Sequence, residues 1–190
     1  SIEMQALNTP SSAAYGDDVR ASVTKVTRNG VPEITWRLET PLGAIERRRV
    51  WEEASYSWAI SSWGIHDEQG LRVLVRALRS RTYAPLWDNY RAWDDYVGDA
   101  GVVYALAGYS AMGHLMHYWM GAERTIYAAA DWPETIREVV DEANANNLAL
   151  IDLLARAPRE LVGRIERQPA EPVAVSDRDG VLEVSRDDGR

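Results

Sequence analysis

The chain has 190 residues, which is enough for one domain with a sizeable hydrophobic core. Its net charge of −8 argues against nucleic-acid binding, and the absence of cysteine excludes disulfides, thiolate catalysis and cysteine-ligated metals. No apolar run reaches the roughly 18 residues that a membrane span needs, and residues 1–20 lack the basic and apolar parts of a secretory signal. We therefore expect a cytoplasmic protein that binds neither nucleic acid nor membranes.

Residues 1–18 are rich in Ser, Ala, Asn and Pro and are expected to form a flexible arm. The following segment, residues 22–51, predicts an antiparallel meander of three strands. Asn29-Gly30 is a strong signal for a type I′ hairpin turn between the first two strands. Apolar and polar side chains alternate over residues 33–39, which is typical of a strand with one buried face.

The apolar spacing changes to that of a helix after Asp67, a residue well placed to cap the helix N-terminus. A second amphipathic helix is expected over residues 86–98. Residues 101–107 are a short, continuous apolar run, which favours a buried strand of a parallel sheet.

Helical segments follow this predicted strand. One begins near Ser110, and a shorter one follows Gly121. The longest opens with Asp131 as its N-cap and Pro133 in its first turn, and it extends to about Ala157. A strand followed by helices is the order found in α/β proteins, so α/β is the predicted fold class.

Residues 163–190 contain many charged side chains, and they belong to the part of the chain after Trp132 that contains no aromatic side chain. Two structures fit this segment equally well. One is a β-hairpin around Asp179-Gly180, and the other is a disordered tail with a weak β tendency.

His114 and His117 lie in the stretch GYSAMGHLMHYWMG, residues 108–121. At helical spacing both rings lie near one face, with Tyr118 beside the second ring. A metal site needs a third ligand, and no third ligand is evident nearby, so we predict no metal and no bound cofactor. The Met and aromatic residues around the two histidines suit either a hydrophobic core, which is the favoured interpretation, or the lining of a flat ligand pocket.

Three consecutive arginines are candidates for binding the carboxylates of a ligand. On a strand, Arg47 and Arg49 share one face, while Arg48 points to the other. A solvated edge strand protected by charge explains the same three residues equally well. Both interpretations stay open at this point.

Four stretches resemble, in their order and spacing, segments of the uroporphyrinogen decarboxylase superfamily. ETPLGAIERRRVW (residues 39–51) is similar to its T-P-x-G strand turn, and WGIHDEQGLRVLVRAL (residues 63–78) to the helix that follows. YAPLWDNYRAWDDYVGDAGVVYALAG (residues 83–108) is similar to its next helix and strand. Residues 109–155 resemble a strand end, a helix, a D-x-P-E cap and a long helix, so that the resemblance covers residues 40–161.

The resemblance implies a (β/α)8 barrel of the TIM type, which binds its ligands at the C-terminal ends of the strands. Residues 19–162 would form a partial barrel, with the β-meander at its N-terminal side and a non-matching C-terminal tail. The family includes decarboxylases of tetrapyrrole acetate groups, in porphyrin biosynthesis, and methyltransferases that use a corrinoid protein. A tetrapyrrole or corrinoid is therefore the implied ligand, and Tyr109, His114, His117 and Tyr118 are the residues expected to contact it.

The family's substrate-binding arginines and key aspartate lie in an N-terminal part, and a functional histidine lies near the C-terminus; neither part has a counterpart here. We therefore expect no lyase activity from this chain alone. The alternative is a non-enzymatic binding module that pairs with a second copy or a complementing chain, since an open barrel exposes strand edges and an apolar face. A monomeric α+β domain of unrelated function is a third interpretation.

Overall fold

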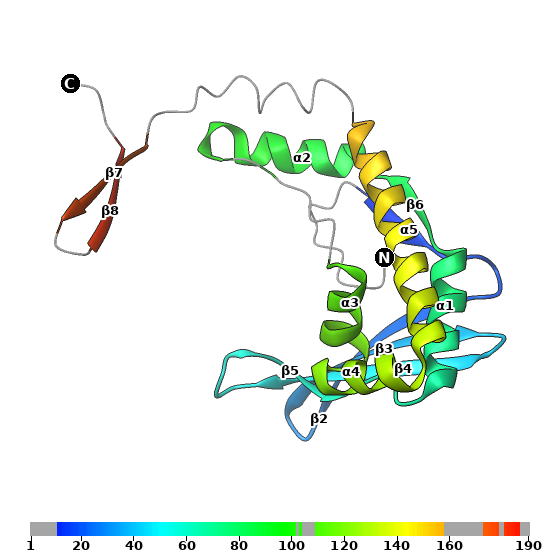
Figure 1. Ribbon diagram of the computed structural model, residues 1–190. Coiled ribbons are helices and arrows are strands. Elements are labelled where there is room, and N and C mark those ends of the chain that lie inside the picture. The colour runs from blue at the N-terminus through cyan, green and yellow to red at the C-terminus, as the bar shows by residue number, and fades with distance from the viewer. Residues whose placement is uncertain (1–10, 102, 104–108, 158–172, 179–180, 187–190) are drawn as a thin grey trace. The chain divides into compact units, whose positions relative to one another are not determined.

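The chain divides into two compact units, Ser1–Arg156 and Ala157–Arg190. In its described part, the first unit holds a four-stranded sheet, a two-stranded sheet and the helices, and the second unit holds a two-stranded sheet. The computed structural model (Figure 1) describes residues 11–101, 103, 109–157, 173–178 and 181–186.

The predicted meander is confirmed, and it has one strand more than the sequence predicts. Asn29 and Gly30 have φ angles of 50° and 80°, the positive values that a type I′ turn requires at both positions. The strands run antiparallel in the order β2-β3-β4-β5, and the register places Trp36 opposite Arg47. The strand bounds are β2 (Arg20–Arg28), β3 (Val31–Thr40), β4 (Gly43–Glu52) and β5 (Ser57–Ser62).

The predicted helices are present, with a correction at the start of the longest one. Asp67 caps α1 as predicted, since its side chain accepts a hydrogen bond from the backbone N–H of Gly70 at 2.8 Å. Asp131, the predicted cap of α5, instead ends α4, and Trp132 is the N-cap. The break falls at Trp132 because a residue before proline is disfavoured in the helical conformation.

The helical segments of the first unit lie between residues 68 and 155, and strand β6 (Thr82–Pro85) separates α1 from α2. No helix among the described residues is long and apolar enough to cross a membrane. The bounds are α1 (Glu68–Ser80), α2 (Trp87–Val97), η1 (Gly98–Ala100), α3 (Ala111–His114), the π-helical turn η2 (Leu115–Trp119), α4 (Ala122–Asp131) and α5 (Pro133–Ala155).

Part of the predicted flexible arm is a strand, which corrects the sequence prediction. Strand β1 (Ser11–Ala14) pairs antiparallel with β6 (Thr82–Pro85), the strand that follows α1. The pairing ties the first described residues of the chain to the end of that helix. Small and polar residues carry little strand signal, and here a partner far along the sequence determines the strand.

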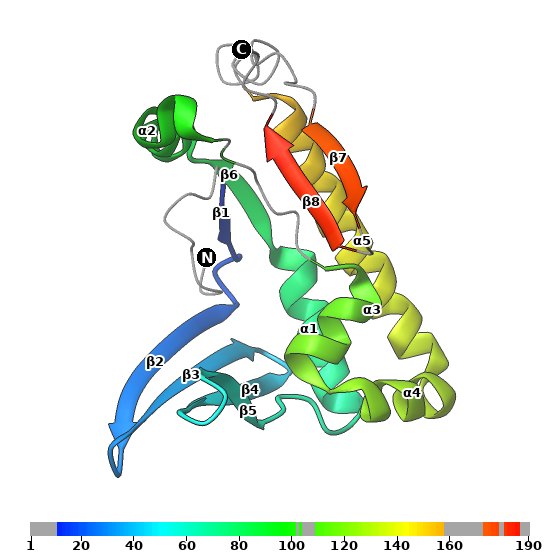
Figure 2. The same cartoon turned by 90° about the vertical axis from the view of Figure 1, so that its left-hand side faces the viewer.

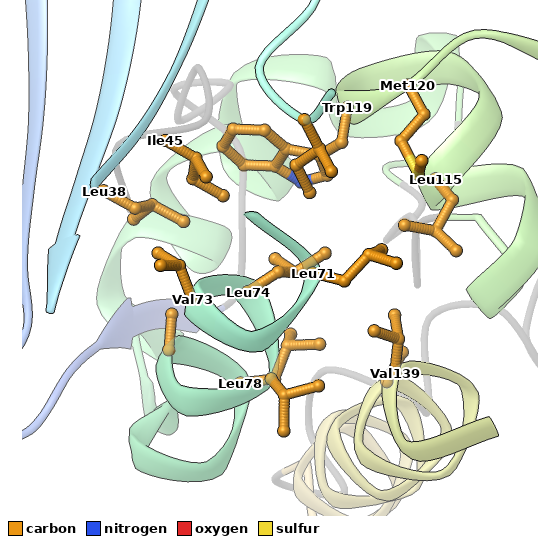
Figure 3. Packing of buried hydrophobic residues seen from close by; sticks show 14 of the residues in the cluster. Leu38, Ile45, Leu71, Val73, Leu74, Leu78, Leu115, Trp119, Met120 and Val139 are labelled. Carbon is orange, nitrogen blue, oxygen red and sulfur yellow. The ribbon is translucent and has the colours of Figure 1, made fainter. Parts of the chain in front are cut away.

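Helix α1 is the central element of the hydrophobic core. It lies between the sheet and α5, and it buries side chains toward both of them (Figure 2). Figure 3 shows Leu71 and Leu74 of α1 close to Ile45 of the sheet and to the side chains of η2. Val139 of α5 completes the core on the other side of the helix.

The predicted α/β barrel of the TIM type, partial or complete, is wrong. Every strand pair among the described residues is antiparallel, whereas such a barrel needs parallel neighbours. The meander strands are joined by short turns, which only antiparallel neighbours allow, and the strand after α1 pairs with β1 rather than with the meander. The predicted strand over residues 101–107 lies mostly outside the described residues, and Gly101 and Val103 belong to no strand.

The described part of the second unit is an antiparallel pair of strands, β7 (Val173–Arg178) and β8 (Val181–Arg186), with Arg178 opposite Val181. This pairing agrees with the predicted β-hairpin, and the predicted turn at Asp179-Gly180 lies outside the described residues.

Candidate functional site

The four residues predicted to contact a ligand form one cluster of rings, which we call the aromatic cluster: Tyr109, His114, His117 and Tyr118. The rings of Tyr109 and His117 are stacked, with centroids 4.7 Å apart and an interplanar angle of 20°. Tyr118 meets Tyr109 edge-on at 5.6 Å. His114 lies 5.1 Å from Tyr118, at an angle of 47°. The four rings therefore form a continuous series of contacts in the order His114, Tyr118, Tyr109, His117.

The π-helical turn η2 sets the geometry of this cluster. The Ser110 side chain caps α3 by accepting a hydrogen bond from the N–H of Gly113 at 3.2 Å. The helix then widens, and the N–H of Met120 donates to the carbonyl of Leu115 at 2.8 Å. Leu115 is buried, whereas His117 is exposed. Such π-helical turns occur frequently at functional sites, so this one marks the cluster as a candidate.

The guanidinium of Arg47 lies behind the aromatic cluster, inside the protein. Its Cζ is 4.4 Å from the ring centroid of Trp36 and 4.5 Å from that of Tyr118, and Trp119 lies at 5.4 Å. Arg47 is only 3% exposed. The attraction between a cation and aromatic faces is strongest when water is excluded, so these rings stabilise the buried charge.

Arg49 extends the positive charge toward the edge of the cluster, and together with Arg47 it forms what we call the arginine pair. Its Cζ lies 5.8 Å from the ring of Tyr118 and 5.9 Å from that of Trp36. Arg49 is half-buried. The predicted alternation is confirmed, because both members of the pair face the rings.

The outer face of the same strand has a different chemistry. Arg48 donates to a carboxylate oxygen of Glu46 at 3.0 Å, and Arg37 donates to the other oxygen at 3.4 Å. The pKa of Glu46 is held below its ordinary value chiefly by the hydrogen bond from Arg48. The outer arginines are thus paired with acids, while the inner pair lies against aromatic rings.

The cluster has an exposed end and a buried end. Tyr109 is 48% exposed and His117 is also exposed, while His114 and Tyr118 are half-buried. Tyr109 is held by Asn147 of α5, whose side-chain amide donates to the Tyr109 carbonyl at 3.3 Å. The exposed, stacked rings of Tyr109 and His117 contact Tyr118, which in turn lies against the guanidinium of Arg47. A flat anion is the kind of ligand that such an arrangement attracts.

The geometry does not assemble a metal site at the two histidines. Within the described ranges, no three side chains of His, Asp or Glu lie close enough together to hold a metal ion. The i, i+3 spacing of His114 and His117 instead places both rings against tyrosines.

Trp36 and Trp119 belong to the site but were not predicted as site residues. The position of Trp36 could have been predicted from the sequence. The short turn after Thr40 pairs Thr40 with Gly43, and counting back along both strands from this pair places Trp36 opposite Arg47. Nothing in the spacing shows that the buried side chain of Trp119 reaches the same guanidinium, since that contact depends on the packing of η2 against the sheet.

No protein-family model, curated protein or solved structure matches this chain.

Proposed function

We propose that the aromatic cluster and the arginine pair bind a flat, carboxylated macrocycle of the tetrapyrrole type. The observation that carries the proposal is the position of Tyr118, whose ring lies 4.5 Å from the Arg47 guanidinium and 5.6 Å from the exposed Tyr109 ring. One surface thus combines stacking with positive charge. The resemblance of residues 40–161 to the uroporphyrinogen decarboxylase superfamily supports the choice of a tetrapyrrole or a corrinoid.

The two parts of the site have separate roles in this proposal. Tyr109 and His117 offer their stacked, exposed rings to the face of the macrocycle, which buries apolar area on both partners. Arg49 attracts a carboxylate group at the edge of the macrocycle, and the buried Arg47 adds to the positive potential. We propose binding in the cytoplasm, and neither decarboxylation nor methyl transfer by this chain alone.

Titration with coproporphyrin, a tetrapyrrole that carries carboxylates, tests this proposal. Porphyrin absorbance and tryptophan emission would report the binding. The variants Tyr109→Ala and His117→Ala are expected to bind about tenfold more weakly, because each loses a stacking ring. Tyr127→Ala is the matched control, since Tyr127 is an exposed tyrosine on α4, 61% accessible and outside the cluster. Equal affinity in all four proteins would refute the proposed site.

Hydroxocobalamin, a corrinoid without free carboxylates, separates the two ligand classes. If the corrinoid binds as tightly as the porphyrin and the same variants weaken it, the rings rather than the arginine pair select the ligand. If only the porphyrin binds, the carboxylates are required, as we propose.

Self-association is a second candidate function, in line with the alternative of a non-enzymatic module. Leu148 and Ile151 stand three residues apart on α5 and are 63% and 48% exposed, so they share one apolar face. Sedimentation velocity over a range of concentrations would detect pairing of two copies. Leu148→Ser is expected to abolish a dimer that uses this face, and a monomer at all concentrations would exclude this function.

A further inference from the structure

A second concave site lies away from the aromatic cluster, where β6 and the first turn of α2 meet the C-terminal part of α5. It has a volume of ≈ 460 Å³, within the range of about 300 to 1,000 Å³ that is usual for small-molecule pockets. One wall consists of Tyr83, Pro85 and Trp87. The other, which we call the α5 wall, consists of Ala149, Asp152 and Leu153 of α5 together with Arg156, the C-cap residue of that helix. No part of this pocket is used by the proposed macrocycle site.

The α5 wall presents two opposite charges to the pocket. Asp152 and Arg156 are both exposed and stand four residues apart, so their side chains project from the same face of the helix. In the described part of the chain they form no ion pair with one another or with any other side chain. Each charge is therefore available to a ligand.

The opposite wall is aromatic and is held in place by its own element. Tyr83 belongs to β6, which is fixed by its pairing with β1. The guanidinium of Arg81 lies 5.2 Å from the ring of Tyr83 and supports it. Trp87 is the first residue of α2, a helix whose N-cap makes no side-chain hydrogen bond. A ligand between these rings and Leu153 would bury an aromatic or large apolar group.

We propose that this pocket binds an aromatic α-amino acid as its zwitterion. The ligand's carboxylate pairs with Arg156, its ammonium group pairs with Asp152, and its ring lies between Leu153 and the aromatic wall of Tyr83 and Trp87. The dipole of α5 favours the ammonium group, because Asp152 lies in the last turn of that helix, where the carbonyl groups have no partner within the helix. Two opposite charges one helical turn apart, beside an aromatic wall, match this ligand class better than a simple anion or cation.

Isothermal titration of the full chain with L-phenylalanine tests the proposal. Two analogues dissect it: 3-phenylpropionate lacks the ammonium group, and 2-phenylethylamine lacks the carboxylate. Each analogue is expected to bind about tenfold more weakly than L-phenylalanine, because it leaves one charged group of the pocket without its partner. No binding of L-phenylalanine at millimolar concentration would overturn the proposal, and so would equal binding of either analogue.

Variants with matched controls on the same helix locate the binding. Asp152→Asn and Arg156→Gln are each expected to weaken L-phenylalanine binding about tenfold. Asp141→Asn and Arg137→Gln change the same charges at exposed positions of α5 outside the pocket and are expected to leave the affinity unchanged. Ala149→Trp fills the pocket without changing its charge and should abolish binding. Equal weakening by test and control variants would overturn the assignment, while circular dichroism verifies that each variant is folded.

Discussion

Arg47 occupies a position that is rarely given to a charged residue. Its side chain is 3% exposed and lies among the rings of Trp36, Tyr118 and Trp119. The next residue, Arg48, is exposed and pairs with Glu46. Both arginines belong to strand β4, but Arg47 is buried among aromatic rings and Arg48 is exposed beside a carboxylate.

This contrast predicts different effects of the same substitution at the two positions. Arg47→Ala is expected to lower the free energy of unfolding by about 3 kcal/mol, because three rings lose their cation and a cavity remains. Arg48→Ala is expected to change it by less than about 1 kcal/mol, since an exposed ion pair contributes little. Urea unfolding followed by tryptophan emission measures both values. Equal destabilisation by the two variants would mean that the rings do not stabilise Arg47.

The residues of the aromatic cluster illustrate what spacing can predict. The i, i+3 spacing of the histidines predicts that both rings lie near one face of a helix, with Tyr118 beside the second ring. In the structure Tyr118 instead lies against the first histidine, His114, and His117 stacks on Tyr109. The π-helical turn could not be predicted, because it depends on how Leu115 and Trp119 pack against α1 and the sheet. The stacking of Tyr109 on His117 depends in turn on that packing.

At the scale of elements, the contact between α1 and α5 includes a polar link at their adjacent ends. The hydroxyl of Thr135, in the first turn of α5, donates to Glu68, in the first turn of α1, at 2.7 Å. Arg72 donates to the same carboxylate oxygen at 2.8 Å. The hydrogen bond from Thr135 is the main cause that lowers the pKa of Glu68 below its ordinary value of 4.5, and Arg72 adds to it.

This link predicts a pH-dependent contribution of Thr135 to stability. A carboxylate whose pKa is lowered on folding stabilises the folded state above its unfolded pKa, and this contribution is lost as the pH falls through the lowered value. The stability difference between the protein and Thr135→Val should therefore be full at neutral pH and shrink below about pH 4.5.

Urea unfolding at several pH values from neutral to acidic measures this difference. Thr125→Val is the matched control, because Thr125 is also buried but donates to the carbonyl of Gly121, which does not titrate in this range. The effect of the control should not vary with pH. A difference for Thr135→Val that stays constant on acidification would contradict the assigned link.

The sequence predicted the elements whose structure depends on residues close together in the chain. It did not predict the strands whose structure depends on pairing with a strand elsewhere in the chain. Asn29-Gly30 and Asp67 act within a few residues, so their turn and cap were predictable. Strand β5 lies in a stretch rich in Ser and Ala, and β1 exists only because β6 pairs with it. In both cases the partner strand, rather than the intrinsic propensity of the residues, determines the structure.

For the whole molecule, the pairing of the strands differs from the barrel that the resemblance implies. Strand β6 follows α1 in the chain, but it pairs antiparallel with β1, outside the meander. The result is an antiparallel sheet covered by α1, with α5 on the far side of that helix. The candidate macrocycle site is assembled only by this packing, since its residues come from β3, β4, α3, η2 and the segment before α3.

The net charge of −8 affects how an anionic ligand reaches this site. The overall field of the protein repels an anion, so binding requires local positive charge at the site itself. Arg48→Gln and Arg49→Gln change the net charge by the same amount. Any difference between their affinities for an anion therefore reports the position of the charge and not the overall field.

The most direct test of the account is the affinity for coproporphyrin of the unmodified chain, Arg49→Gln and Arg48→Gln, measured in one buffer. Arg49 faces the aromatic cluster, whereas Arg48 lies on the outer face and pairs with Glu46. The account predicts that Arg49→Gln binds about tenfold more weakly and that Arg48→Gln stays within about twofold of the unmodified chain. Equal affinities of the two variants would contradict the claim that the inner arginine pair and the aromatic cluster form one binding site.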